Sequence, residues 1–366
     1  MNSPDRTVAR KSSIEGLYVW AREWRSANWQ KLHWFIVFHT SIVGVRQGCL
    51  LSPCLFKIFL EQIMIEALES FEGNVRMVWR SIKNLRFADG IDLIAGSMKE
   101  LAEHTERLDK SASAFEMEIS AEKSKIMVTP ATNDNNTNIL ITVDGSKLQS
   151  VKTFKYRGSN VAEDGTAVRE VKIKLAIATQ HLSKLKKIWS SKNISTKTKM
   201  SLVRWVVNSI ALYCCESWTL TPNLEKRIAA FEMRCFHRLL QIPYPTHRTI
   251  IAVTQQVTSM IGKFEPLIQI VRRRKLQWFE HVSRHTDSLA NTIMQGSLSG
   301  KRTRGRPKTS WIDNIHSWTG LSHEHCLRNC WDRNNWQMIV HAAKAPQRPL
   351  AMDMNWTELC AIGVGN

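Results

Sequence analysis

The spacing of hydrophobic positions changes once along this chain, near residue 165. Upstream of that point, Ser52 followed by Pro53 and by apolar residues at helical spacing predicts a helix over about 53–71. Ser97, with an acid three residues later, predicts the capped start of a second helix. Downstream of it, every apolar stripe has the period of a helix.

Two Asp-Gly pairs between β-forming stretches predict hairpins. Asp89-Gly90 lies within the apolar residues 82–95, and Asp144-Gly145 joins 139–143 to 147–156. The same pattern predicts strands over 75–79 and 126–128 and a polar loop over 130–138. The upstream part of the chain therefore mixes helices with antiparallel hairpins.

Three apolar stripes mark the helices beyond residue 165. They consist of Val171, Leu175, Ala178, Leu182, Leu185 and Trp189; of Met200, Val203, Val207 and Ile210; and of Leu224, Ile228, Phe231, Cys235 and Leu239. A mixed block followed by helices predicts an α+β fold. We expect a poorly defined segment over 1–43, a mixed domain over 44–160, a helical region over 161–262 and a basic helical region over 263–366.

The charge balance indicates the class of partner. Lys and Arg number 51 and Asp and Glu 32, so the net charge is +19, which favours a protein that neutralises phosphates. The most apolar run, 32–45, is shorter than the roughly 18 residues of a membrane span, so we expect no membrane association. No secretory signal is evident, so the eight cysteines predict free thiols in a reducing compartment, nuclear or cytoplasmic.

Cations cluster in the helical part. Between Val171 and Cys215 there are nine Lys and Arg and no acid. We expect these cations, including Lys184, Lys186 and Lys187, to face outward and to contact a nucleic-acid backbone, although a merely solvated face is the alternative. Two further basic clusters are Arg272, Arg273, Arg274 and Lys275, and the tract 301–308, a mobile arm or a nuclear localisation signal.

Other groups of reactive or aromatic residues favour packing over chemistry. His323, His325, Cys326 and Cys330 are zinc-ligand types, but they are too crowded in sequence for an ordinary tetrahedral site, so we expect a chance cluster. Cys214-Cys215 is expected on a buried helical stripe. The 14 tryptophans are expected mostly in the core, with base stacking open to one or two near the basic clusters.

Two segments can carry nucleotide chemistry. Residues 44–53 combine glycines with Gln47 and a helix start, a combination that suits close contact with a nucleotide. The alternative interpretation is a loop that enters a buried helix. Residues 85–93 place Asp89 at a hairpin tip between apolar strands, which a plain Asp-Gly turn explains equally well.

The order and spacing of these two segments resemble the reverse transcriptases of non-LTR (LINE-type) retrotransposons, which combine an endonuclease with a reverse transcriptase. The resemblance continues at Lys123, at 154–159 and in tracts at 213–219, 273–281 and 305–313. It implies part of a polymerase palm followed by a helical thumb and a basic C-terminal region. Ancestral activity would be RNA-directed DNA synthesis, with RNA or DNA as partner.

The resemblance also implies residue roles. Asp89 would be the catalytic and metal-binding aspartate for Mg²⁺, and Gln47, Gly48 and Lys123 would contact nucleotide or template. Phe154, Tyr156 and Gly158 would contact the primer, although Arg157 stands where the family usually has an apolar residue.

Two departures from the family pattern predict impaired catalysis. Gly90 stands where the second of two adjacent aspartates should be, and Asp92 is two residues too far along the strand to replace it. The family's upstream aspartate also has no match, since the acids before Gly44 are Asp5, Glu15 and Glu23, so we expect the chain to begin inside the palm. The hypothesis is a catalytically impaired polymerase remnant. The alternatives are a non-enzymatic RNA- or DNA-binding protein and an expressed element remnant without a selected role.

Overall fold

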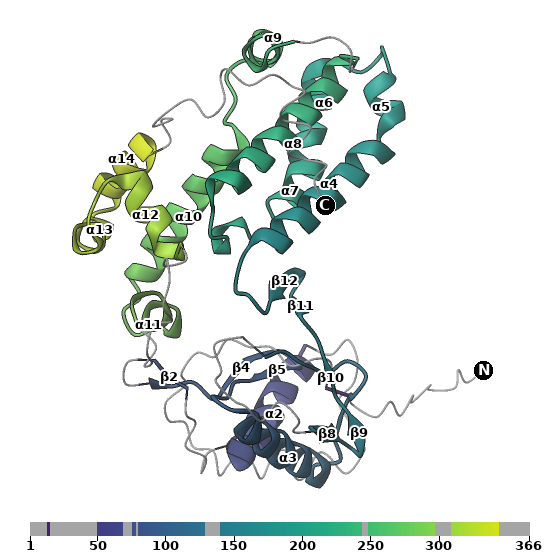
Figure 1. The fold of residues 1–366 in the computed structure, drawn as a ribbon, viewed down its shortest axis with the longest axis vertical. Helices are drawn as coiled ribbons and strands as arrows, with labels where there is room; N and C mark the ends of the chain where they lie inside the picture. Colours follow the sequence, from purple (N-terminus) through teal and green to yellow (C-terminus); the bar gives the residue numbers. More distant parts are fainter. Residues whose placement is uncertain are drawn as a thin grey trace. The chain divides into compact units, whose positions relative to one another are not determined.

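The computed structural model of the chain describes residues 13–14, 50–68, 75–77, 80–128, 140–243, 248–296 and 309–343. The chain divides into two compact units, 1–154 with 295–301, and 155–294 with 302–366 (Figure 1). Helices combine with short strand pairs, most of them antiparallel, which confirms the predicted α+β class. The boundary falls six residues before the expected one at 160/161.

Two helices, α2 (Ser52–Leu68) and α3 (Met98–Ala114), form the core of the first unit. They pack through buried aliphatic side chains and an edge-on contact between Phe59 and Phe115, whose ring centroids are 5.4 Å apart. Helix α2 begins one residue earlier than predicted, because the Leu51 carbonyl already accepts a hydrogen bond from the Leu55 amide at 2.9 Å.

The predicted cap of α3 is confirmed, with one difference. The Ser97 hydroxyl accepts from the Glu100 amide at 3.2 Å, as in a capping box. The Glu100 carboxylate, however, accepts from the Gly96 amide at 2.9 Å, one residue before the position that the motif predicts. The first contact satisfies a donor that the first turn of the helix leaves open, and the second pairs the amide of the residue before the cap.

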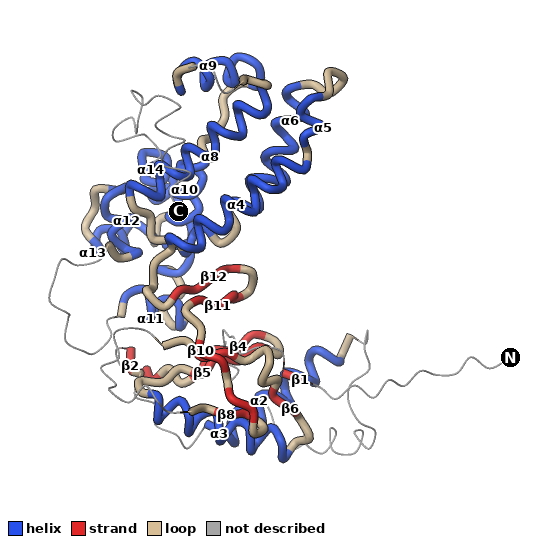
Figure 2. Tube along the Cα trace, turned by 45° about the vertical axis from the view of Figure 1, so that its right-hand side comes forward, coloured by secondary structure: helices blue, strands red, loops and turns tan. Residues whose placement is uncertain are grey.

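Strand pairs surround these helices (Figure 2). The antiparallel pairs are β2 (Arg76–Met77) with β3 (Arg80–Ser81), β4 (Asn84–Phe87) with β5 (Gly90–Leu93), and β8 (Thr142–Val143) with β9 (Ser146–Lys147). The parallel pairs are β1 (Ser13–Ile14) with β6 (Glu118–Ile119), and β7 (Lys125–Ile126) with β10 (Gln149–Ser150). The predicted turn at Asp144-Gly145 is confirmed, with φ of 47° and 70°. The expected loop 130–138 lies outside the described residues.

The second unit begins at Lys155, inside the hairpin of β11 (Thr153–Tyr156) and β12 (Ser159–Ala162), and is otherwise helical. Its helices are α4 (Val168–Lys184), α5 (Lys186–Ser190), α6 (Thr196–Leu202), the π-helix η1 (Val203–Asn208), α7 (Ser209–Ala211), the 3-10 helix η2 (Cys215–Ser217), α8 (Pro222–Leu240), α9 (Ile250–Ile261), α10 (Leu267–Ser283), α11 (Leu289–Gln295), α12 (Trp311–Thr319), α13 (His323–Cys330) and α14 (Arg333–Ala343). None of these described helices is long and apolar enough to cross a lipid bilayer.

One hydrophobic core holds these helices together, and the three predicted stripes all contribute to it. Residues on both sides of the expected boundary at 262/263 share this core, because α8 and α10 pack against each other. The first stripe is interrupted at Leu185, where α4 ends and α5 begins, a break that its periodicity did not predict. The boundary at 262/263 stays a prediction, and the shared core spans it.

A buried carboxylate closes the start of α10. Glu232 on α8 accepts a hydrogen bond from the Leu267 amide at 3.0 Å, which satisfies a donor in the first turn of α10. Burial raises the pKa of Glu232 from its ordinary 4.5 to about 8. The folded protein thus binds a proton between these pH values that the unfolded chain does not, so stability falls as pH rises through this window.

We expect Glu232→Gln to remove this dependence, because a neutral amide oxygen can still accept from the Leu267 amide. At about pH 8.5 the variant should be more stable than the wild type by about 1–3 kcal/mol, and near pH 5 the two should be similar. Urea unfolding at both pH values measures this difference. Glu324→Gln, at an exposed position, is the control and should change neither value; equal stability of wild type and Glu232→Gln at both pH values would contradict the assignment.

Candidate nucleic-acid interface

Asp89 lies in the turn of the β4–β5 hairpin and is half-buried. The strands pair in the register Leu85 with Asp92 and Phe87 with Gly90. The two turn residues are therefore Ala88 and Asp89, one position earlier than the predicted Asp89-Gly90 turn. Ala88 has a φ of 55°, a left-handed conformation that carries a steric cost for a residue with a Cβ.

Gly90 is the first residue of β5 and is buried. Its neighbour Ile91 is fully buried in the core of the first unit, and Arg86 on the partner strand pairs with Glu61 of α2 at 2.8 Å. These contacts hold the hairpin against α2. Asp92 lies two residues further along β5, about 6–7 Å from Gly90, so its carboxylate does not occupy the place of a side chain at Gly90.

The resemblance implies a magnesium site at this hairpin, but the carboxylate donors for such a site are incomplete here. A two-ion polymerase site needs several carboxylate oxygens around the ions. At the hairpin tip, Ala88 and Gly90 carry no oxygen donor beside Asp89, and the described residues contain no group of three or more His, Cys, Asp or Glu side chains placed to hold a metal ion. The residues described therefore do not fit a two-ion magnesium site.

Of the residues assigned to nucleotide or template, the structure describes only Lys123. Lys123 is exposed in the turn between β6 and β7. Gln47 and Gly48 lie outside the described residues, as do the basic tract 301–308 and most of the first 49 residues.

The β11–β12 hairpin carries the residues assigned to the primer. Phe154 and Tyr156 are half-buried on β11, and the turn is formed by Arg157 and Gly158, with φ of 42° and 83°. The positive φ of Gly158 favours glycine, and a Cβ there would be in ordinary van der Waals contact with the Tyr213 ring, at 3.4 Å.

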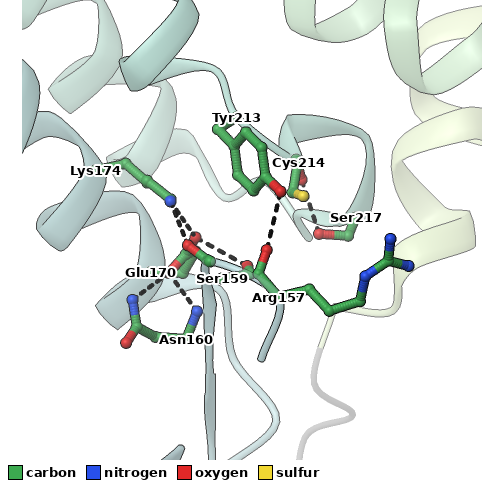
Figure 3. Close-up of polar contacts among 9 residues, drawn as sticks. Arg157, Ser159, Asn160, Glu170, Lys174, Tyr213, Cys214 and Ser217 are labelled. Atoms are coloured by element: carbon green, nitrogen blue, oxygen red, sulfur yellow. Dashed lines mark hydrogen bonds and ion pairs between the residues drawn. The ribbon is translucent and has the colours of Figure 1, made fainter. Parts of the chain in front are cut away.

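A polar network fixes this hairpin to the helices of the second unit (Figure 3). Buried Glu170 on α4 accepts from the Ser159 hydroxyl at 2.9 Å and from the Asn160 amide at 2.7 Å. Lys174, one turn later, donates to the Gly158 carbonyl and lies 3.7 Å from Glu170.

Tyr213 completes the attachment from a third segment. Its hydroxyl donates to the Arg157 carbonyl at 2.9 Å, and the centre of its ring lies 4.5 Å from the Lys174 ammonium. The Arg157 side chain, in contrast, extends away from Tyr213 and is exposed (Figure 3). The hairpin and α4 are thus held as one element.

The sequence predicts that the nine cations between Val171 and Cys215 face outward, but in the structure two of them do not. Lys174 and Lys199 are buried. The Lys199 ammonium donates to the carbonyls of Trp189 and Ser191, at 2.8 and 2.7 Å, because the end of α5 leaves these acceptors without helical partners. The exposed members of the set are Lys184, Lys186, Lys187, Lys192, Lys197 and Arg204.

The Lys199 contacts tie α6 to the end of α5, and these two helices lie side by side at one end of the helical unit (Figures 1 and 2). We call Lys184, Lys186, Lys187, Lys192 and Lys197 the α5–α6 corner. The sequence places no acid among them, so their positive field is not offset locally.

The second basic cluster is mostly structural, unlike the exposed backbone-binding cluster that was expected. Arg272 is buried and pairs with Glu225 at 3.2 Å, and half-buried Arg273 pairs with Glu265 at 2.9 Å. Arg274 is the exposed member, and its guanidinium also donates to the Leu212 carbonyl. Because α10 crosses the core, a run of consecutive cations on it cannot all reach solvent.

Lys275 is fully buried. Its ammonium donates to the Trp218 carbonyl and to the Asn314 side-chain oxygen, both at 2.7 Å, and lies 4.4 Å from the centre of the Trp311 ring. Burial lowers the pKa of Lys275 to about 7. It therefore joins α10 to α12 and to the residues after η2 and is not accessible to a phosphate.

The cysteines and histidines at 323–330 divide between core and surface. Cys326 and Cys330 are buried in the helical core, whereas His325 is exposed and its ring nitrogen lies 2.9 Å from the Ser322 hydroxyl. Cys215 is buried as predicted, but Cys214 is only half-buried, because its φ of 56° ends the helical stripe before it. The absence of a zinc site here stays a prediction.

Comparison with known proteins agrees with the resemblance at the level of the domain. Residues 10–161 match the family model described as reverse transcriptase (RNA-dependent DNA polymerase). The chain is also 24% identical over 243 residues to a putative uncharacterized transposon-derived protein of Caenorhabditis elegans, an alignment that covers 66% of this chain and 86% of that protein. Residues 10–161 are thus similar to a reverse transcriptase domain, and about two thirds of the chain is similar to that relative.

The reverse transcriptase match ends at residue 161, inside β12. It includes the Asp89 hairpin and the primer-type hairpin up to its last strand. The cation-rich helices of the second unit lie beyond it. The similarity to the transposon-derived protein is longer than this match, but the name of that protein assigns no function to the helical unit. Its function must therefore be inferred from its structure.

We expect Lys275→Met to change the pH dependence of stability. The unfolded chain binds a proton at Lys275 between pH 7 and 10.5 that the folded protein has released, so this lysine makes wild-type stability rise with pH in that window. The stability of Lys275→Met relative to wild type should thus fall by about 1 kcal/mol per pH unit over the window. Urea unfolding at about pH 7 and pH 9.5 measures it, with exposed Lys186→Met as control. A constant difference would mean that the ammonium stays charged inside the fold.

Proposed function

We propose that the chain is the remnant of a LINE-type retrotransposon RNA-directed DNA polymerase whose catalytic chemistry is impaired and whose helical unit still binds nucleic acid. The reverse transcriptase match over 10–161 and the transposon-derived relative support the origin. The exposed, acid-free cations of the α5–α6 corner are the observation that carries the binding function.

Gly90 supports the proposed loss of catalysis. In a polymerase of this type, paired carboxylates assemble two divalent ions, one activating the primer hydroxyl and the other holding the triphosphate. Here the hairpin offers Asp89 without a neighbouring carboxylate, and the register places Asp92 too far along β5 to supply it. Asp89 could hold at most part of such a site.

The β11–β12 hairpin supports a role in positioning nucleic acid. Its attachment through Glu170, Lys174 and Tyr213 fixes its turn to the same unit that carries the α5–α6 corner. We propose that Phe154, Tyr156 and Gly158 face a primer strand while the corner contacts its phosphates. Phosphate contacts position a nucleic acid without distinguishing its bases, so the expected binding has little sequence preference.

A non-enzymatic RNA- or DNA-binding protein is the second candidate, favoured by the same exposed cations. Like the first, it predicts binding without DNA synthesis, but it makes binding the function of the chain and not what is left of a polymerase. An expressed element remnant without a selected role predicts neither activity nor organised binding.

The chain should show no measurable DNA synthesis on a primed RNA template with Mg²⁺ or Mn²⁺, because Gly90 leaves Asp89 without the adjacent carboxylate that completes the ion clamp. A primer-extension assay tests this, with binding of the same protein preparation to the primed template as the control for folding. Incorporation above background that is lost in Asp89→Ala would contradict the proposed impairment.

Binding to nucleic acid should weaken steeply with salt. If about four to six phosphates contact the exposed cations, log affinity should fall against log salt with a slope of about −3 to −5. Replacing Lys184, Lys186 and Lys187 by Glu should flatten the slope by about two to three units, roughly one for each phosphate that the protein no longer neutralises. Filter binding at several salt concentrations measures both slopes.

The matched control reverses three exposed lysines of the first unit, Lys57, Lys99 and Lys110, and so changes the net charge equally. Its slope should stay close to that of the wild type. An equal flattening by both triple variants would mean that net charge, and not the α5–α6 corner, drives binding.

A further inference from the structure

Trp205 is exposed on the surface of the helical unit, unlike most of the tryptophans that the structure describes there. Its side chain is 80% exposed, whereas Trp189, Trp218 and Trp336 are buried in the core. It lies in the π-helix η1, and the Ser209 hydroxyl donates to the Trp205 carbonyl at 2.8 Å, satisfying an acceptor that the wider turn displaces. Such π-helical segments occur frequently at functional sites.

Cations accompany this ring along the helix surface. Helices α6, η1 and α7 follow one another without a break over 196–211. Lys197, Ser201 and Trp205 are exposed at four-residue spacing, which places them on successive turns, and exposed Arg204 directly precedes the tryptophan. No carboxylate occurs in the sequence between Val171 and Cys215. The ring is thus exposed within a segment of the sequence whose only charges are positive.

This combination fits a ligand with a flat aromatic face and a nearby negative charge. A nucleobase and its phosphate have that chemistry, and base stacking on an aromatic side chain tolerates any sequence. In a duplex both faces of each interior base are already stacked on their neighbours, so an exposed ring selects unpaired bases. An apolar protein surface would gain nothing from the surrounding cations and would reduce their solvation.

We propose that Trp205 stacks on an unpaired base of single-stranded RNA or DNA, while Arg204 and Lys197 contact its phosphates. The inference rests on the proposed nucleic-acid binding and deepens it, because it assigns a base-contacting position and a preference for single strands. The Trp205 ring is exposed on η1, while other residues of the same element are buried in the helical core.

The test compares a single-stranded DNA of about 15 nucleotides with an abasic strand of the same length and phosphate number. Trp205→Ala should weaken binding to the base-bearing strand by about 5- to 100-fold and leave binding to the abasic strand unchanged. The slope of log affinity against log salt should stay as in the wild type, because no phosphate contact is removed. Trp205→Phe should retain most of the affinity.

Trp331 provides the matched control, because it is 61% exposed and is followed by Asp332, outside the acid-free segment. Trp331→Ala should bind both strands as the wild type does. Unchanged affinity of Trp205→Ala for the base-bearing strand, or an equal reduction on the abasic strand, would overturn the stacking proposal and leave the α5–α6 corner as the binding surface. If the wild type binds neither strand at low salt, the proposed function fails as well.

Discussion

Buried ammonium groups paired with backbone carbonyls hold the helical unit together. Lys174 donates to Gly158, Lys199 to Trp189 and Ser191, and Lys275 to Trp218, each at a place where a strand or helix ends. Carbonyl oxygens at such ends lack a helical or strand partner and must find a donor. In a chain with 51 cations and 32 acids, lysine is the available donor, and it joins elements that the apolar core alone would leave free to shift.

The same excess of cations explains the outer surface. Some acids of the helical unit form ion pairs with its arginines, as in Arg272 with Glu225 and Arg273 with Glu265. The exposed lysines of the acid-free segment have no counter-charge nearby in the sequence. The α5–α6 corner is the result. Because buried Lys199 fixes α6 against the end of α5, the positive charges there have a defined arrangement, and electrostatic attraction to a phosphate backbone requires little reordering.

The two hairpins show how similar local motifs acquire different roles. Around Asp89 the strands pair so that the turn contains Ala88, and buried Gly90 joins the sheet, which leaves one carboxylate at the tip. Around Gly158 the turn is packed beneath Tyr213 and bonded to Lys174, so this hairpin is fixed to the helices. The reverse transcriptase match includes both up to residue 161, and each is held by its own contacts, the first to α2 and the second to α4 and Tyr213.

Local periodicity and turn chemistry determined the elements: the helix from Ser52, the cap at Ser97, the turn at Asp144-Gly145 and the apolar stripes beyond residue 165 all followed from the sequence. Tertiary packing decided which cations are buried, because the side of α10 or α6 that meets the core depends on helices distant in sequence. Arg272 and Lys275 belonged to a basic run yet became core residues, while Trp205, in a chain whose tryptophans were expected mostly in the core, became exposed. The spacing of apolar residues in the sequence determines which stripe of a helix is hydrophobic. Only the contacts between helices determine which polar residues are buried along with that stripe.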